Sequence, residues 1–152
     1  MRTLVDYSVG PGSSPIVQDD KLILVCDGVD EQFVLALDTS TGRELWRTAR
    51  PPKRAENGEY RKAYSTPLVI EVDGKTQVVA PSAQWICAYN PANGEEIWRF
   101  DHSDGFSVCT RPIQIDVLIV FSTGYRRSNL VAVRTDGRGD VTATHEAWRL
   151  IR

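Results

Sequence analysis

The chain has 152 residues, of which 41% are hydrophobic and 25% charged, and its 18 basic and 20 acidic side chains give a formal net charge of −2. This balance is typical of one folded domain rather than a disordered chain, and it provides no general positive field for gathering a nucleic acid. The longest apolar runs, such as residues 117–121, are far shorter than the roughly 18 residues of a membrane-spanning helix, so we expect no direct membrane insertion. The first residues also lack the apolar core of a signal peptide.

Short apolar and β-branched runs, separated by Gly, Asp and Asn, predict strands along the whole chain, and no stretch has helical periodicity. In chain order the predicted strands are residues 15–18, 22–26, 33–38 and 44–48, then 67–71, 77–80, 85–90 and 96–100, then 112–115, 117–122, 129–134 and 146–150. Asp, Asn and Gly tolerate the positive φ of tight turns, which predicts hairpins at residues 19–20, 41–42, 73–74 and 93–94. The prediction is an all-β fold.

These strands belong to three repeats of four strands each. Residues 33–47 return at residues 85–99, and a weaker third copy with six extra residues spans residues 129–149. The third strand of each unit is apolar on both faces, and face-to-face packing of four-stranded sheets in a β-propeller buries both faces. A small residue and a tryptophan recur in every copy, with a glycine between them in the first two, and we predict that these residues pack between neighbouring units. They are Ala36, Gly42 and Trp46, then Ala88, Gly94 and Trp98, then Ala132 and Trp148.

The segment Ala36-x-Asp38-x-x-Thr41-Gly42-x-x-x-Trp46 resembles the tryptophan-docking motif of the pyrroloquinoline quinone (PQQ)-like propeller repeats. The second unit has Asn90 in place of the aspartate, and the third keeps only the alanine and the tryptophan. This superfamily includes quinoprotein alcohol dehydrogenases and an outer-membrane assembly propeller lipoprotein, and its members are often exported or periplasmic. The resemblance implies a β-propeller segment of about three four-stranded antiparallel blades.

The rings of this family usually hold seven or eight blades, so we expect an incomplete ring that is completed by missing blades or by another copy of the chain. Residues 1–9 are a possible outer strand of a preceding blade. The predicted organisation of the rest is blade 1 at residues 10–50, a connecting loop at 51–63, blade 2 at 64–101, a second connecting loop at 102–110 and blade 3 at 111–152.

Strand alternation places the blade-to-blade connections and the loops between second and third strands at one end of the sheets, here called the loop face. Its segments are residues 27–32, 50–64, 83–84, 101–110 and 123–128. Arginine interleaved with tyrosine is typical of protein-binding hot spots, and the alternative is a solvated loop surface without a partner. The candidate binding residues are Arg54, Tyr60, Arg61, Lys62, Arg111, Tyr125, Arg126 and Arg127.

Other groups receive a structural interpretation. The three cysteines form no C-x-x-C pair, which argues against a disulfide framework or a zinc site, and Cys26 and Cys87 lie in apolar runs that predict burial. Residues 27–31 are interpreted as a solvated turn rather than a weak calcium site, and residues 101–104 as a solvated connection rather than a catalytic triad. His145 is expected to be exposed, and residues 138–140 to form a turn.

The leading hypothesis is a non-enzymatic protein-binding scaffold with no catalytic residue, metal or cofactor and no nucleic-acid partner. The alternative is a fragment of a PQQ-dependent quinoprotein dehydrogenase whose catalytic residues lie in missing blades, with PQQ and calcium as its cofactors. The resemblance implies adjacent bonded cysteines in many alcohol dehydrogenases, and this chain has no such pair. We therefore favour the scaffold.

Overall fold

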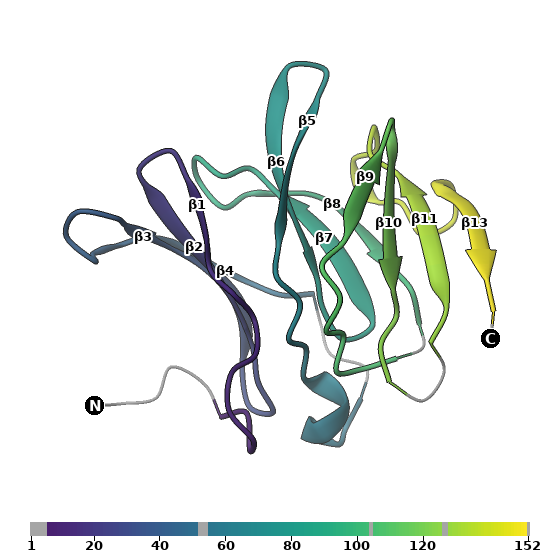
Figure 1. Ribbon diagram of the computed structural model, residues 1–152, viewed down its shortest axis with the longest axis horizontal. Helices are drawn as coiled ribbons and strands as arrows, with labels where there is room; N and C mark the ends of the chain where they lie inside the picture. Colours follow the sequence, from purple (N-terminus) through teal and green to yellow (C-terminus); the bar gives the residue numbers. More distant parts are fainter. Residues whose placement is uncertain (1–5, 52–54, 104, 126–127, 152) are drawn as a thin grey trace.

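Three sheets lie side by side in the computed structural model, which describes residues 6–51, 55–103, 105–125 and 128–151 (Figure 1). Four strands of each sheet form an antiparallel meander, and the three sheets do not close into a ring (Figure 1). This arrangement confirms the predicted all-β propeller segment of three blades.

The strands follow the predicted ones to within two residues at each end. Blade 1 contains β1 (Ile16–Gln18), β2 (Lys21–Asp27), β3 (Gln32–Asp38) and β4 (Glu44–Ala49). Blade 2 contains β5 (Leu68–Val72), β6 (Lys75–Pro81), β7 (Trp85–Tyr89) and β8 (Glu96–Asp101). Blade 3 contains β9 (Ile113–Ile115), β10 (Leu118–Ser122), β11 (Leu130–Arg134) and β13 (Glu146–Leu150).

Two short elements differ from the prediction. The extra residues of the third repeat were expected to form a turn, but β12 (Gly139–Asp140) pairs in parallel with β8 and becomes a fifth strand of the second sheet. The Val141 N–H extends this pairing by donating to the carbonyl of Arg99 at 2.9 Å. The second element is the 3-10 helix η1 (Gly58–Arg61), which begins after Asn57, whose side chain accepts a hydrogen bond from the N–H of Glu59. A pairing of two residues and a single helical turn are too short to leave a period in the sequence.

The hydrophobic core consists of layers between the blades. One layer joins blades 1 and 2, with Ile23, Val34 and Tyr89 among its fully buried side chains, and the next joins blades 2 and 3. All five residues of β7 are buried because blade 2 is covered on both faces. Cys26 and Cys87 are buried as predicted, and Cys109 is exposed.

The repeated tryptophans lie at equivalent positions in the three sheets. Trp46 pairs with Ala36 in the register of blade 1, and Ala88 pairs with Trp98 in the same way in blade 2. The Trp46 Nε1 donates to the carbonyl of Pro91 in the next blade at 3.0 Å, while Trp98 is 0% exposed and donates to Gln77 Oε1 at 3.0 Å. The Trp46 bond joins blades 1 and 2, while Trp98 bonds within blade 2 and packs in the core layer shared with Ile119 and Val133 of blade 3.

Candidate functional site

The connections at the loop face lie against one another. The Tyr64 N–H donates to the carbonyl of Val108 at 2.7 Å, and the Ser107 N–H donates to the carbonyl of Lys62 at 2.7 Å. The Tyr125 N–H in turn donates to the carbonyl of Phe106 at 2.9 Å. These bonds join both blade-to-blade connections and the β10–β11 loop into one surface, at the end of the sheets opposite the β5–β6 turn (Figure 1).

Two glycines permit the close approach of these loops. A Cβ added to Gly105 would lie 1.8 Å from the carbonyl oxygen of Thr123, and one added to Gly124 would lie 2.4 Å from that of Phe106. Both glycines have positive φ, at +111° and +96°, which L side chains rarely adopt. The positions of Phe106 and Tyr125 thus depend on two residues that carry no side chain.

Three aromatic rings meet on this surface and form what we call the aromatic patch: Tyr60, Phe106 and Tyr125. The ring centroids of Tyr60 and Phe106 are 4.7 Å apart, and those of Phe106 and Tyr125 are 5.7 Å apart in an edge-to-face arrangement. Tyr125 is 63% exposed and Tyr60 is 37% exposed. Phe106 was not among the candidate binding residues, although its place in a blade-to-blade connection put it on the loop face.

The candidate cations occupy different environments. Arg61 is half-buried, and its Nε and Nη2 donate at 2.7 Å to the carbonyls of Ala55 and Glu56 within its own loop. Lys62 is buried, and its Nζ lies 2.5 Å from a carboxylate oxygen of Glu59, which raises the Lys62 pKa. Arg111 is exposed. Arg54, Arg126 and Arg127 lie outside the described residues.

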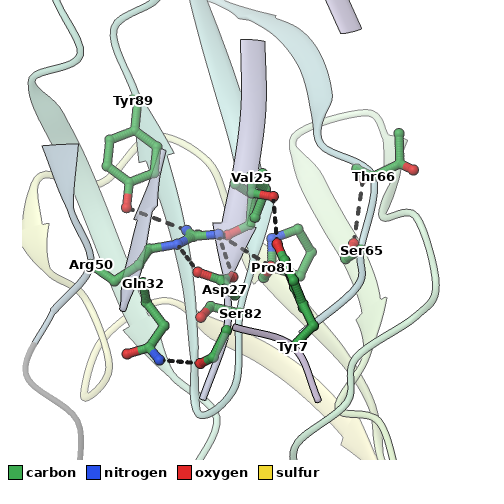
Figure 2. A network of polar contacts seen from close by, with 12 residues as sticks. Tyr7, Val25, Asp27, Gln32, Arg50, Ser65, Thr66, Pro81, Ser82 and Tyr89 are labelled. Atoms are coloured by element: carbon green, nitrogen blue, oxygen red, sulfur yellow. Dashed lines mark hydrogen bonds and ion pairs between the residues drawn. The ribbon is translucent and has the colours of Figure 1, made fainter. Parts of the chain in front are cut away.

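A buried ion pair joins blades 1 and 2 beneath the loop face (Figure 2). The Nε and Nη2 of Arg50 donate to the two carboxylate oxygens of Asp27 at 3.1 and 3.0 Å, and the side chains are 2% and 0% exposed. Arg50 Nη1 also donates to the carbonyl of Ala80 at 3.0 Å and lies 3.3 Å from the hydroxyl of Tyr89 in blade 2 (Figure 2). Burial lowers the Arg50 pKa, but the Asp27 carboxylate more than offsets this effect, so the pKa is raised overall.

This ion pair corrects the interpretation of residues 27–31 as a solvated turn at its first residue, whereas Asp30 and Glu31 are exposed as expected. Asp27 is the last residue of β2 and is fully buried, because the guanidinium group of Arg50 neutralises its charge and satisfies both of its oxygens. The pairing was not visible in the sequence, because Asp27 ends β2 while Arg50 follows β4, and the two residues lie 23 positions apart.

The prediction of a solvated connection at residues 101–104 is also wrong for its first two residues. His102 is 0% exposed and Asp101 is 8% exposed. The His102 Nε2 lies 3.0 Å from the carbonyl of Ser82, which can only accept, so this nitrogen carries the hydrogen. The His102 ring also meets that of Phe121 in blade 3, with centroids 5.6 Å apart. His145 was expected to be exposed but is half-buried beside Gly137.

Calcium takes six to eight oxygen ligands, and the described residues contain no group of three or more His, Cys, Asp or Glu side chains that could hold a metal ion. Among these same residues, no helix is long and apolar enough to span a membrane.

Comparisons with known proteins agree with the architecture. A family model described as outer membrane protein assembly factor BamB matches residues 4–146. No curated protein shows significant similarity to the chain. Among solved structures, BamB from Moraxella catarrhalis is similar with a TM-score of 0.65 and 16% identity over 99% of this chain and 41% of that one.

A europium-containing methanol dehydrogenase is similar with a TM-score of 0.62 and 13% identity, over 93% of this chain and 25% of the dehydrogenase. At these identities the two likenesses show the fold alone. The chain spans less than half the length of either structure. From the family match and the three-blade architecture, the chain belongs to the BamB-like family of PQQ-like β-propeller proteins.

Proposed function

We propose that this chain is a non-enzymatic protein-binding scaffold and that the aromatic patch is its contact surface. The observation that carries the proposal is the convergence of Tyr60, Phe106 and Tyr125 from three separate loop segments, with Tyr125 63% exposed. Tyrosine is enriched at interface hot spots because it offers a large apolar area and a polar tip with few rotatable bonds.

The support beneath the patch favours a preformed surface. Backbone hydrogen bonds and the contacts of Gly105 and Gly124 hold the loops before any partner arrives. A surface that is already ordered loses less conformational entropy on binding. The exposed Arg111 adds a cation on the same connection as Phe106.

The partner proposed is another protein. The matching family is described as an outer membrane protein assembly factor, and a role in protein assembly requires contacts with other polypeptides. Lys62 contributes to the patch as a support rather than as a free charge, because its ammonium group faces Glu59.

Site-specific photocrosslinking tests this proposal. A photoreactive phenylalanine at position 125 should give protein adducts in cells, and the same residue at the exposed Ala92 in the β7–β8 turn should give none. Changing Arg111 to Glu should reduce the adducts formed from position 125. Adducts from position 92 alone, or equal adducts from both positions, would contradict a contact through the aromatic patch.

The second candidate function is a fragment of a PQQ-dependent dehydrogenase, and the similarity to a methanol dehydrogenase favours it. PQQ with calcium would then be the cofactors, and blades outside this chain would supply catalytic residues. Mixing the protein with PQQ and calcium tests this candidate: a shift of the quinone absorbance would support cofactor binding by these blades, and an unchanged spectrum would contradict it.

A further inference from the structure

The contact between blades 1 and 2 shows how a tryptophan docks on a neighbouring blade. Trp46 lies on the turn at residues 91–94, where its Nε1 donates to the carbonyl of Pro91 at 3.0 Å. A Cβ on Gly94 would lie only 2.5 Å from Cε3 of Trp46, so the indole rests directly on the glycine. The hydroxyl of Thr48 completes the contact by donating to the carbonyl of Gly94 at 2.6 Å. We call residues 91–94 the docking turn of blade 2.

Blade 1 has the same turn without a tryptophan on it. The Gly42 N–H donates to the carbonyl of Asp38 at 2.8 Å, as the Gly94 N–H does to that of Asn90 at 2.8 Å. The φ angles of Gly42 and Gly94 are +69° and +75°. A Cβ on Gly42 would meet nothing within 4 Å, so the docking turn of blade 1, residues 39–42, is open.

At the other end of the stack, the tryptophan of blade 3, Trp148, does not rest on a docking turn of a neighbouring blade. Trp148 pairs with Ala132 as Trp46 does with Ala36, yet it is 42% exposed. Leu130 and Leu150 also pair with each other, and each lies two residues from the Ala132–Trp148 pair in its strand, so both side chains are on the same face of the sheet as Trp148. Leu130 is 40% exposed and Leu150 is 56% exposed. The corresponding faces of blades 1 and 2 are buried under the next blade.

We propose that a second copy of this chain docks head to tail, with Trp148 of one copy resting on the docking turn of blade 1 in the other. Each chain carries both halves of the contact that already joins blades 1 and 2, and an exposed apolar face of this kind is uncommon on a soluble monomer. The interface is heterologous, because a tryptophan face meets a turn rather than another tryptophan face. Tyr7 covers Cys26, Phe33 and Leu35 on the free face of blade 1, so the contact centres on the turn end, where Gly42 lies.

This surface is independent of the aromatic patch. The docking turns lie between third and fourth strands, at the end of the sheets opposite the loop-face connections. A partner on the loop face and a second copy on the blade 3 face can therefore bind together, and variants of one surface serve as controls for the other.

Sedimentation of two complementary variants tests the proposal. Trp148→Glu removes the indole and places a charge on the docking face, while Gly42→Asn covers the turn with a residue that tolerates positive φ. Wild-type protein at micromolar concentration should sediment above the 17.0 kDa monomer, and each variant alone as a monomer. An equimolar mixture should form heterodimers, because the Gly42→Asn chain keeps its tryptophan and the Trp148→Glu chain keeps its turn. Circular dichroism of each variant establishes that it is folded.

The loop-face variant Tyr125→Glu is the matched control and should associate as the wild type does. A monomeric wild-type chain would overturn the proposal and assign the blade 3 face to a blade of a different chain or of a longer one. Self-association of Gly42→Asn to the wild-type extent, or a mixture that stays monomeric, would overturn the head-to-tail geometry.

Discussion

Arg50 and Asp27 form the most deeply buried ion pair among the described residues, and its contribution to the free energy of unfolding depends on both partners. Arg50→Met should lower the free energy of unfolding by about 3–5 kcal/mol, because it removes the buried guanidinium that donates to both carboxylate oxygens of Asp27. The double variant Asp27→Leu with Arg50→Met should recover much of this loss, since replacing both members of a buried pair is often close to neutral. Urea denaturation of the two variants measures the difference.

The matched control is Arg47→Met, which removes a guanidinium from an exposed pair with Glu44 at 2.9 Å. Exposed pairs contribute about 0–1 kcal/mol, so this variant should unfold near the wild-type urea concentration. Equal losses from Arg50→Met and Arg47→Met would mean that the buried pair has no special role in joining the blades.

Asp38 makes stability depend on pH through the docking turn of blade 1. Hydrogen bonds from Ser40 and Thr41 lower its pKa from 3.8 to about 2. Because the native pKa is lower than the unfolded one, the unfolded chain binds more protons between these values, and stability is lost as the pH falls from 3.8 towards 2. Asp38→Asn, which copies Asn90 of blade 2, should lose less stability over this range. Urea midpoints measured at several acid pH values test this, and parallel losses in both proteins would contradict it.

At the scale of elements, Gly42 and Gly94 are a natural matched pair. Gly42→Ala should lower the free energy of unfolding only through the strain of a positive φ, about 1–2 kcal/mol. In Gly94→Ala the new methyl group would also collide with the Trp46 ring and the Thr48 hydroxyl. Gly94→Ala should therefore lower the free energy of unfolding distinctly more than Gly42→Ala. Both changes are best compared in the Trp148→Glu background, where the proposed association is absent. Equal losses of stability in the two variants would mean that the packing of the Trp46 indole does not require a glycine at position 94.

The strands and loops also show which features of the fold can be predicted from the sequence. Strand positions were predictable because each strand carries its own apolar period and is bounded by turn residues. The β12 strand was missed because its partner lies some forty residues earlier and only two residues pair. The burial of Asp27 and His102 was missed for a related reason: each depends on groups from another strand or loop, Arg50 and Ser82, which no local pattern joins.

For the candidate site, strand alternation predicted which loops share a face, and the hydrogen bonds from Ser107 to Lys62 and from Tyr64 to Val108 agree with that grouping. The alternation could not predict which side chains on the face are free. Lys62 is paired with Glu59, and Phe106 lies between two tyrosines, because the loop backbone, held by Gly105 and Gly124, decides where each side chain points.

Across the whole molecule, blade 2 has a neighbour on each face and blades 1 and 3 have one blade neighbour each. Repeat stacks gain much of their stability from contacts between neighbours, so the middle repeat should open least often. Val79, Ile86 and Ala88 of blade 2 are all 0% exposed. Amide hydrogen exchange of the Trp148→Glu monomer should be slowest in β6 and β7 and faster in β9 and β13.

Trp98 controls how strongly blade 3 is joined to that middle blade. The side chain is fully buried, and the core layer that contains it also holds Ile119 and Val133 of blade 3. Trp98→Ala should lower the free energy of unfolding by about 3–5 kcal/mol, whereas Trp148→Ala, at an exposed position, should cost much less. Because the lost contacts lie on one side of blade 2, the amides of β10 and β11 should exchange faster while those of β2 and β3 change less. A uniform increase across all three blades would contradict coupling between neighbours and would mean that the stack unfolds as one unit.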